Sequence, residues 1–463
     1  MPQTSDSEAD FFLQQGWQLS QVGAYEDAIA SFDQCLELRP DSHRAWCARG
    51  TALYELGRFE DAARSFNQAI DLKPDYPEAL NSRGMALFSL GSYEAALASY
   101  DKAIAFQPSF HQAWYNRGNA LDRAGCYEAA LQSYERTLEL EPDYSKSWYN
   151  RGIMLSKLGR HEEAIASYDK AIESRPHYSM AWYNRANALV LLKRYRDALQ
   201  SYERVLSIRP QWHAAWYNQG NVLHKIGRYE EAIASYDEAL KSKPDLYEGW
   251  YNRGNAFDAL GRYDAAIASY DQAISLKPDL QEAWYNWGSA LHKLGRYQDA
   301  IANYDKAISL KSNFSKAWYS KGTAYRKLGR YAEAIASYDR ALQCQPDLYE
   351  AWYCRGIALG HLGRNEAALK SYDKALEVNP NFHLAWYSRG AALSHLGNYE
   401  DAVASYDRAL HIKPDFPDAH TRRRLALERY QQLHRDVSDE RTEPQTLPDL
   451  PFVEPLQPFQ PNL

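Results

Sequence analysis

"AWYNRGNAL", residues 113–121, recurs almost unchanged along this chain. Near-copies begin 34, 68, 102 and 136 residues later, and read "SWYNRGIML", "AWYNRANAL", "AWYNQGNVL" and "GWYNRGNAF". A catalytic motif has no use for five evenly spaced copies. The interval therefore indicates a structural repeat, in which each unit is one supersecondary element stacked on the next.

Proline and tryptophan mark the 34-residue period along most of the chain. Proline occupies the same repeat position from Pro40 to Pro414, and the series is interrupted once, by Ser312. Tryptophan recurs with the same spacing from Trp114 to Trp386. Numbering each unit so that this proline is position 32 places alanine at position 20 of every unit. The pattern predicts twelve units.

Each unit reads as two helices joined by a tight turn. In unit 111–144, apolar and small residues recur with helical periodicity over 111–124 and again over 127–140. Gly125 between them suits the left-handed residue that ends a helix, and Pro142 prevents extension of the second helix. One such hairpin cannot bury its apolar face alone, so the units must stack.

These features resemble the tetratricopeptide repeat family. The resemblance lies in the 34-residue period, with Trp at position 4, Gly at 8, Ala at 20, Tyr or Phe at 24 and Pro at 32. The sequence is similar to long tandem arrays of bacterial and cyanobacterial style. The resemblance implies an all-α fold, a right-handed superhelical solenoid. The chain departs from the family pattern at position 7, which is mostly Arg where Leu is common.

The ends of the chain differ from the array. We predict an N-terminal tail at 1–8, tandem units at 9–416, a C-terminal capping helix at 417–434 and a disordered proline-rich tail at 435–463. The N-terminus has no signal-peptide pattern, and no apolar run is long enough to span a membrane. Five cysteines without a C-x-x-C pair favour a reducing compartment. We therefore expect a cytoplasmic protein with no membrane insertion.

The first helix of each unit carries a polar stripe at positions 2, 5, 6, 9, 12 and 13, here called the first-helix stripe. The family resemblance implies that this stripe lines the concave groove of a superhelix. Asparagine is a poor residue for a helix interior, so its recurrence indicates a use for the amide. The candidate peptide-binding residues are Asn116, Asn150, Asn184, Asn218, Asn252 and Asn286 at position 6, Asn119, Asn187, Asn221 and Asn255 at position 9, and Tyr149, Tyr183 and Tyr217 at position 5.

An amide can satisfy a peptide N–H and a peptide C=O together, so a ladder of asparagines could hold an extended chain with little dependence on its sequence. Tyrosines beside the ladder would add apolar contact with a polar tip. Two alternatives remain open at this point. The asparagines could bond neighbouring repeats to each other, or they could recur only because the units were duplicated recently.

The stripe changes along its length. It carries Met180, Val190 and Leu191 in one unit, which suits an apolar side chain. It carries Lys316, Arg326 and Lys327 in another, with Lys293 just before, which suits an acidic group. A solvated face with arbitrary charges is the alternative for these cations.

Nothing in the sequence assembles into a catalytic set. His361 and His395 share position 13 in adjacent units but lack a third metal ligand. No phosphate-binding G-x-x-x-x-G-K-[ST] motif is present. We expect no enzyme activity, no cofactor and no metal.

The predicted function is a non-catalytic protein-protein interaction scaffold that binds extended or helical protein segments in the concave groove. One alternative is an RNA-binding helical-repeat protein, which the net charge of −7 disfavours. Another is a regulatory or assembly subunit of a separate enzyme or membrane complex. The oligomeric state stays open.

Two further expectations concern single segments. Unit 179–212 should be the weak point of the array, because Ala186 and Lys193 replace the glycines of positions 8 and 15. In the C-terminal tail, Phe452 and Phe459 could dock in a groove of this chain or of another copy, whereas a plain disordered tail is the alternative.

Overall fold

The computed structural model describes residues 2–438, with side chains for residues 7–434. Residues 439–463 lie outside the described part, so most of the predicted proline-rich tail does too. In the described residues all regular structure is helical, in 25 α-helices without a strand. The prediction of an all-α repeat fold is confirmed.

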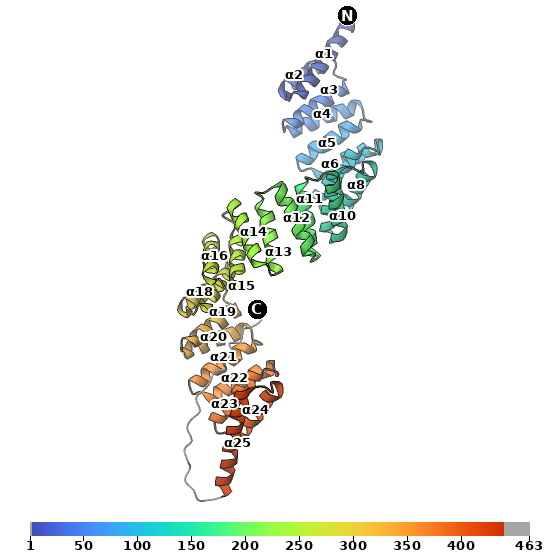
Figure 1. The fold of residues 1–463 in the computed structure, drawn as a ribbon. Helices are drawn as coiled ribbons and strands as arrows, with labels where there is room; N and C mark the ends of the chain where they lie inside the picture. The colour runs from blue at the N-terminus through green and yellow to red at the C-terminus, as the bar shows by residue number, and fades with distance from the viewer. Residues whose placement is uncertain (1, 439–463) are drawn as a thin grey trace. The chain divides into compact units, whose positions relative to one another are not determined.

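The chain divides into two compact units, and the division falls between Val222 and Leu223 inside α13 (His213–Lys225). Figure 1 shows the helices of each unit in chain order. The first unit holds α1 (Pro2–Gln21), α2 (Tyr25–Leu38), α3 (His43–Glu55), α4 (Phe59–Leu72), α5 (Pro77–Ser89), α6 (Tyr93–Phe106), α7 (His111–Arg123), α8 (Tyr127–Leu140), α9 (Ser145–Lys157), α10 (His161–Ser174), α11 (Ser179–Leu191) and α12 (Tyr195–Ile208).

The second compact unit continues the same alternation of 13-residue and 14-residue helices up to a longer last helix. It holds α14 (Tyr229–Ser242), α15 (Tyr247–Ala259), α16 (Tyr263–Leu276), α17 (Gln281–Lys293), α18 (Tyr297–Leu310), α19 (Ser315–Lys327), α20 (Tyr331–Cys344), α21 (Tyr349–His361), α22 (Asn365–Val378), α23 (His383–His395), α24 (Tyr399–Ile412) and α25 (Pro417–Ser438).

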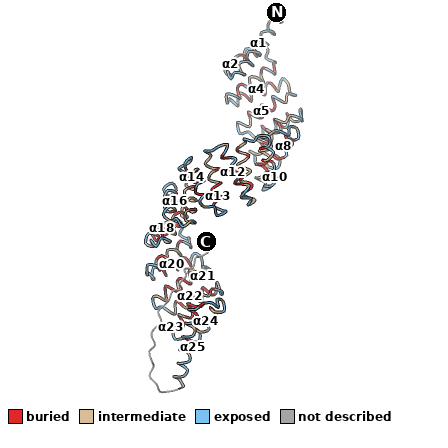
Figure 2. Tube along the Cα trace, viewed as in Figure 1, coloured by how far each residue is buried: buried red, intermediate tan, exposed pale blue. Residues whose placement is uncertain are grey.

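Within each compact unit the helices pack mainly against their neighbours in the chain. Consecutive helices touch from α1 to α12 and again from α14 to α25, and several first helices of successive repeats also touch, as α9 and α11 do. Buried residues therefore lie between neighbouring helices, as Figure 2 shows in red. An array with such contacts should open repeat by repeat under stress rather than as one cooperative globule.

A tyrosine or phenylalanine at position 24 fills the space inside each repeat. Tyr134 of α8 is 1% exposed, and its ring lies against Gly118 of α7. A Cβ atom on Gly118 would lie 2.6 Å from the Tyr134 Cε1 atom, which is closer than real Cβ contacts allow. The aromatic ring at position 24 thus favours glycine at position 8, and one repeat has alanine there, Ala186.

The tryptophans at position 4 lie at the edge of the core. Trp148 and Trp182 are only partly buried. The indole Nε1 of Trp148 donates to the carbonyl oxygen of Pro142 at 2.7 Å, which ties the first helix to the end of the preceding unit. Where the proline is replaced, Trp318 donates to Ser312 at 3.0 Å. A tryptophan indole N–H needs a hydrogen-bond acceptor, and the carbonyl of position 32 supplies one at the edge of the core.

Both ends of the described array extend beyond the predicted boundaries. Helix α1 begins at Pro2, so residues 2–8 are helical where a tail was expected. Proline fits the first turn of a helix because its missing N–H needs no partner there, and no later glycine or proline interrupts the helix before Gly16. Helix α25 continues to Ser438 because its sequence contains no glycine or proline after Pro417.

Unit 179–212 contains the irregular turn that the sequence indicated. Lys193 has a φ of 59°, and among the described residues it is the one non-glycine residue with a positive φ. Eleven repeats place glycine at this position with the same backbone conformation, as at Gly159 (φ 76°) and Gly227 (φ 80°). The backbone of Lys193 therefore adopts a left-handed conformation, which costs a residue with a side chain roughly 1–2 kcal/mol.

Replacing Lys193 with glycine is expected to stabilise unit 179–212 by about 1 kcal/mol, because glycine adopts the left-handed conformation without strain. The measurement is amide hydrogen exchange of α11 and α12, compared with α9 and α10 in the same protein. In the unaltered chain α11 and α12 should exchange faster than both neighbouring repeats. Equal protection before substitution, or no slowing afterwards, would contradict this expectation.

Candidate functional site

The asparagines at position 6 join adjacent first helices. The Asn184 Nδ2 atom of α11 donates to the Tyr149 hydroxyl of α9 at 3.1 Å, and Asn218 Nδ2 of α13 donates to the Tyr183 hydroxyl of α11 at 2.8 Å. The same bond recurs at 3.2 Å from Asn150 to Tyr115 and at 3.1 Å from Asn286 to Tyr251.

The asparagines at position 9 complete the network. In α7 the Asn119 Oδ1 atom accepts from the buried Tyr134 hydroxyl at 2.9 Å and from Asn150 Nδ2 of the next repeat at 3.0 Å. Asn187 accepts from Tyr202 at 2.6 Å and from Asn218 at 3.4 Å. Asn255 accepts from Tyr270 at 3.0 Å and from Asn286 at 2.9 Å.

The ladder also includes a residue that the sequence reasoning missed. Asn116 Nδ2 donates at 3.0 Å to Asn81 Oδ1, and Asn81 stands at position 5, where later repeats have tyrosine. Tyr217, Asn221 and Asn252 take part in contacts as well. The sequence could have indicated this role of Asn81, because asparagine there replaces the tyrosine that recurs at position 5.

The bonds between repeats use the Nδ2 atom at position 6 and the Oδ1 atom at position 9. Asn119 and Asn255 at position 9 also form hydrogen bonds with Tyr115 and Tyr251 of their own helices. Asn184, Asn187 and Tyr183 are all partly buried. Bonding between neighbouring repeats, one of the two alternatives raised by the sequence, therefore accounts for part of the hydrogen-bonding capacity of the ladder.

The electrostatics of the tyrosines agree with this network. Burial raises the pKa of Tyr149, and the hydrogen bond from Asn184 acts in the opposite direction. Burial likewise raises the pKa of Tyr168, the position-24 partner in the same repeat, to about 12. Both phenols are therefore neutral at physiological pH and act as hydrogen-bonding groups rather than as charges.

The arginine at position 7 explains the departure from the family pattern. Arg185 Nε donates to Asp169 of the preceding repeat at 2.6 Å, and its Nη1 donates to Ser201 of its own repeat at 2.7 Å. The guanidinium also lies 5.7 Å from the centre of the Trp182 ring. One side chain thus links three helices, and the signal in the sequence was the constant 16-residue spacing on either side of the arginine.

The position-7 arginines also pair with the carboxylates at position 25. Asp101, Asp169 and Asp237 remain about half exposed, yet each forms an ion pair with the position-7 arginine of the next repeat. Glutamine at 219 and tryptophan at 287 replace that arginine at two junctions. Neither side chain can form an ion pair, so these two junctions have no ion pair between position 7 and the preceding position 25.

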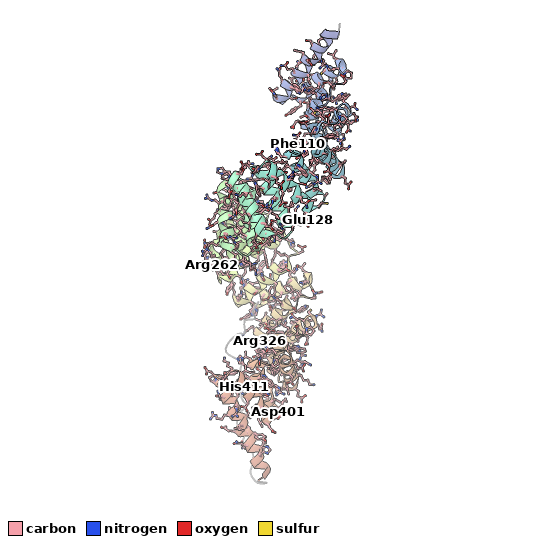
Figure 3. All side chains as sticks on the ribbon, turned by 90° about the vertical axis from the view of Figure 1, so that its right-hand side faces the viewer. Phe110, Glu128, Arg262, Arg326, Asp401 and His411 are labelled. Atoms are coloured by element: carbon pink, nitrogen blue, oxygen red, sulfur yellow. The ribbon has the colours of Figure 1, made fainter. Side chains whose placement is uncertain are left out.

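The predicted basic group is only partly brought together. Lys316 and Arg326 are ten residues apart on α19, which separates them by roughly 15 Å along the helix. Lys293 forms an ion pair with Asp258, with 2.7 Å between Nζ and Oδ2. Arg326, marked in Figure 3, instead groups with Lys327 and with two histidines that the sequence reasoning did not assign to it.

Those histidines are His292 and His361. Burial, then Lys327 and Arg326, lower the pKa of His292 to about 4. Burial, then Arg326, also lower the pKa of His361, whose ring stacks on Tyr331 with 4.5 Å between the ring centres. At neutral pH the positive charge of this group therefore resides on Arg326 and Lys327.

The predicted apolar stretch is less compact than the sequence suggested. Met180 and Val190 are partly buried at opposite ends of α11, whereas the Leu191 side chain is 63% exposed. In the described residues no group of three His, Cys, Asp or Glu side chains could hold a metal ion. The helices from 2 to 438 include none long and apolar enough to cross a membrane.

Comparison with known proteins places the repeats in one family. A family model described as "Tetratricopeptide repeat" matches residues 13–77, 47–110, 81–145, 115–179, 149–211, 285–349 and 353–417. A second model, described as "TPR repeat", matches residues 220–261 and 254–295. No curated protein matches the chain.

Several solved structures are similar to this chain at low sequence identity. YrrB, described as a TPR protein with an unusual peptide-binding site, is 24% identical, with a TM-score of 0.37 over 40% of this chain and 96% of its own. The C-terminal part of a TPR repeat-containing protein from Cytophaga hutchinsonii is 16% identical, with a TM-score of 0.47 over 52% and 98%. The Cut9–Hcn1 structure is 14% identical, with a TM-score of 0.41 over 92% and 98%. At these scores the likenesses carry no inference about ligands.

The matched repeats extend from residue 13 to residue 417, and the described helices follow the same 34-residue alternation over that range. This chain belongs to the tetratricopeptide repeat family.

Proposed function

We propose that this protein is a non-catalytic scaffold that binds extended protein segments along its first-helix stripe. The observation that carries the proposal is the partly used amide ladder. Hydrogen bonds hold Asn184 and Asn187 in one orientation, so that position 6 presents an Oδ1 acceptor and the amide of position 9, which has two N–H donors, presents a donor. A peptide backbone presents the complementary N–H and C=O groups at regular intervals.

Preorganisation favours binding by this ladder. The Asn187 side chain is held by the Tyr202 hydroxyl at 2.6 Å, so a ligand would not have to immobilise it. The entropic cost of ordering side chains at an interface is about 0.5–1.5 kcal/mol for each flexible side chain, and a pre-positioned amide avoids part of that cost. Tyr183, which accepts from Asn218, contributes an aromatic face beside the same amides.

Replacing Asn119, Asn187 and Asn255 together with aspartate tests this proposal. Aspartate keeps the Oδ1 acceptor that bonds the tyrosine and the next asparagine, and it exchanges the Nδ2 donor for a second acceptor. Each lost donor bond is worth about 0.5–1.5 kcal/mol, so the dissociation constant of a bound peptide should rise by roughly 10- to 1,000-fold. The probe is an unstructured peptide selected on the full chain from a random library and measured by fluorescence polarisation.

The matched control is Asn67→Asp. Asn67 lies at position 25, outside the first-helix stripe, where its Oδ1 accepts from Arg83 at 3.1 Å, so aspartate preserves that bond and adds one negative charge, as each single ladder substitution does. This control should leave the peptide affinity unchanged. Alanine is a poorer test at the ladder because it would also remove the bonds between repeats. A folded triple variant with unaltered affinity would show that the ladder serves the stack alone.

A further inference from the structure

The first-helix stripe changes its chemistry after Asn286. Position 6 is Ser320, Cys354 and Ser388 in the following repeats, and asparagine is absent from position 9 there as well. At the junction where earlier repeats have a bond from asparagine to tyrosine, the Tyr319 hydroxyl instead meets the Cys354 thiol at 3.7 Å. The amide ladder thus ends in α17, and the stripe on α19, α21 and α23 offers a ligand different groups.

Earlier junctions neutralise the charges at positions 12 and 13. Lys157 at position 13 pairs with Asp122 at position 12 of the preceding repeat. Lys293 pairs in the same way with Asp258, with 2.7 Å between Nζ and Oδ2. These two pairs show that side chains at positions 12 and 13 of successive repeats lie within ion-pair distance.

The next two junctions place cations and imidazoles at the same two positions. Lys327 stands opposite His292, and His361 stands opposite Arg326. The pKa values reflect this geometry, because Arg326 acts to lower the pKa of Lys327 as well as those of both histidines. These four residues are called the cationic junction here.

The stripe beside the cationic junction is mainly aromatic. Glu350 on α21 acts on Tyr319 and Cys354 and stands at position 2, ten positions before the level of Arg326. Over the stripe of the last four repeats, Lys293, Lys316, Arg326 and Lys327 outnumber Glu282 and Glu350 by four to two. The surface favours a ligand that carries carboxylates between apolar side chains.

We propose that the cationic junction binds the segment 448–461 of the same chain, "PDLPFVEPLQPFQP". This segment lies outside the described residues. Its sequence contains two carboxylates, Asp449 and Glu454, and no lysine or arginine, and Glu454 stands between Phe452 and Phe459. Negative charge flanked by aromatic residues complements two cations surrounded by tyrosines. The segment also contains five prolines, and proline-rich peptides in general lose less conformational entropy on binding than other peptides do.

The chain is long enough for this contact within one molecule. Helix α25 lies three first helices beyond α19, a distance on the order of 30 Å at 8–10 Å for each packed pair of helices. Sixteen residues separate Ser438 from Glu454, and an extended chain of that length reaches roughly 50 Å. The segment would then occupy part of the stripe and compete there with an external ligand.

The test replaces Phe452 with the photoreactive amino acid benzoylphenylalanine in the full-length chain. After illumination in dilute solution, cross-linked peptides of the monomer are identified by mass spectrometry. The expected result is cross-linking within α17, α19, α21 and α23. Cross-links confined to a dimer would show that a second copy is the occupant, and cross-links scattered over the array or absent would overturn the proposal.

Charge reversal tests the ion pairing. Lys327→Glu is expected to lower the cross-linking yield about fivefold or more, because a favourable pair becomes repulsive. Combining it with Glu454→Lys should restore the yield. The control is Lys306→Glu, which makes the same charge change on an exposed residue of α18. An unchanged yield in a helical Lys327→Glu protein would contradict the proposal. The outcome does not depend on the amide ladder, so it is independent of the peptide measurement on the aspartate variants.

Discussion

Replacing Tyr168 with alanine is expected to lower the free energy of unfolding of repeat 145–178 by about 3–5 kcal/mol. Tyr168 in α10 is 1% exposed, and its hydroxyl lies 3.2 Å from the Ser156 Oγ atom. Alanine would leave a cavity over Gly152 and would leave the partly buried Ser156 hydroxyl without this partner. Because the array opens locally, the measurement is native-state hydrogen exchange in α9 and α10.

Trp148→Ala in the same repeat is the informative comparison. Tryptophan is the larger residue, and its size alone would give it the larger contribution to the free energy of unfolding. The structure places Trp148 only partly in the core, where its main polar contact is the 2.7 Å bond to Pro142. Its loss should therefore cost less than the loss of Tyr168. A larger cost for Trp148→Ala would mean that position 4, and not position 24, carries the core of the repeat.

Replacing Gly118 with valine is expected to destabilise repeat 111–144 by about 3 kcal/mol, the upper part of the range for an overpacked core. The new Cβ would lie 2.6 Å from Tyr134 Cε1, so the ring would have to move. That movement would also disturb the 2.9 Å bond from Tyr134 to Asn119 and with it the amide ladder. Chemical denaturation together with hydrogen exchange of α7 and α8 measures the effect.

Gly118→Ala provides the graded control. One repeat already has alanine at position 8, since Ala186 is fully buried while Tyr202 beside it stays 1% exposed. A single methyl group can thus be accommodated, and Gly118→Ala should cost less than Gly118→Val. If valine were tolerated as well as glycine, the close approach of the two helices would not be what requires glycine here.

Local residue preferences determined most of the fold. Position-15 glycines such as Gly159 end the first helix, and prolines such as Pro142 end the second, because each acts through its own backbone conformation. The sequence also predicted the irregular turn, where Lys193 replaces glycine and adopts the left-handed conformation with φ 59°. Repetition then made the stack predictable, since one hairpin cannot bury its own apolar face.

The tertiary structure decided how each polar side chain is used. Asn184 could face a ligand, a neighbouring repeat or both, and only the placement of Tyr149 across the junction commits its Nδ2 atom to the stack. In the same way, the sequence shows Arg326 beside Lys327, whereas the packing of successive first helices adds His292 and separates Lys316. Sequence by itself determined the helices, their turns and their repetition, because those depend on residues a few positions apart. Hydrogen-bond partners and charge groupings depend on distances between helices, so only the tertiary structure could decide them.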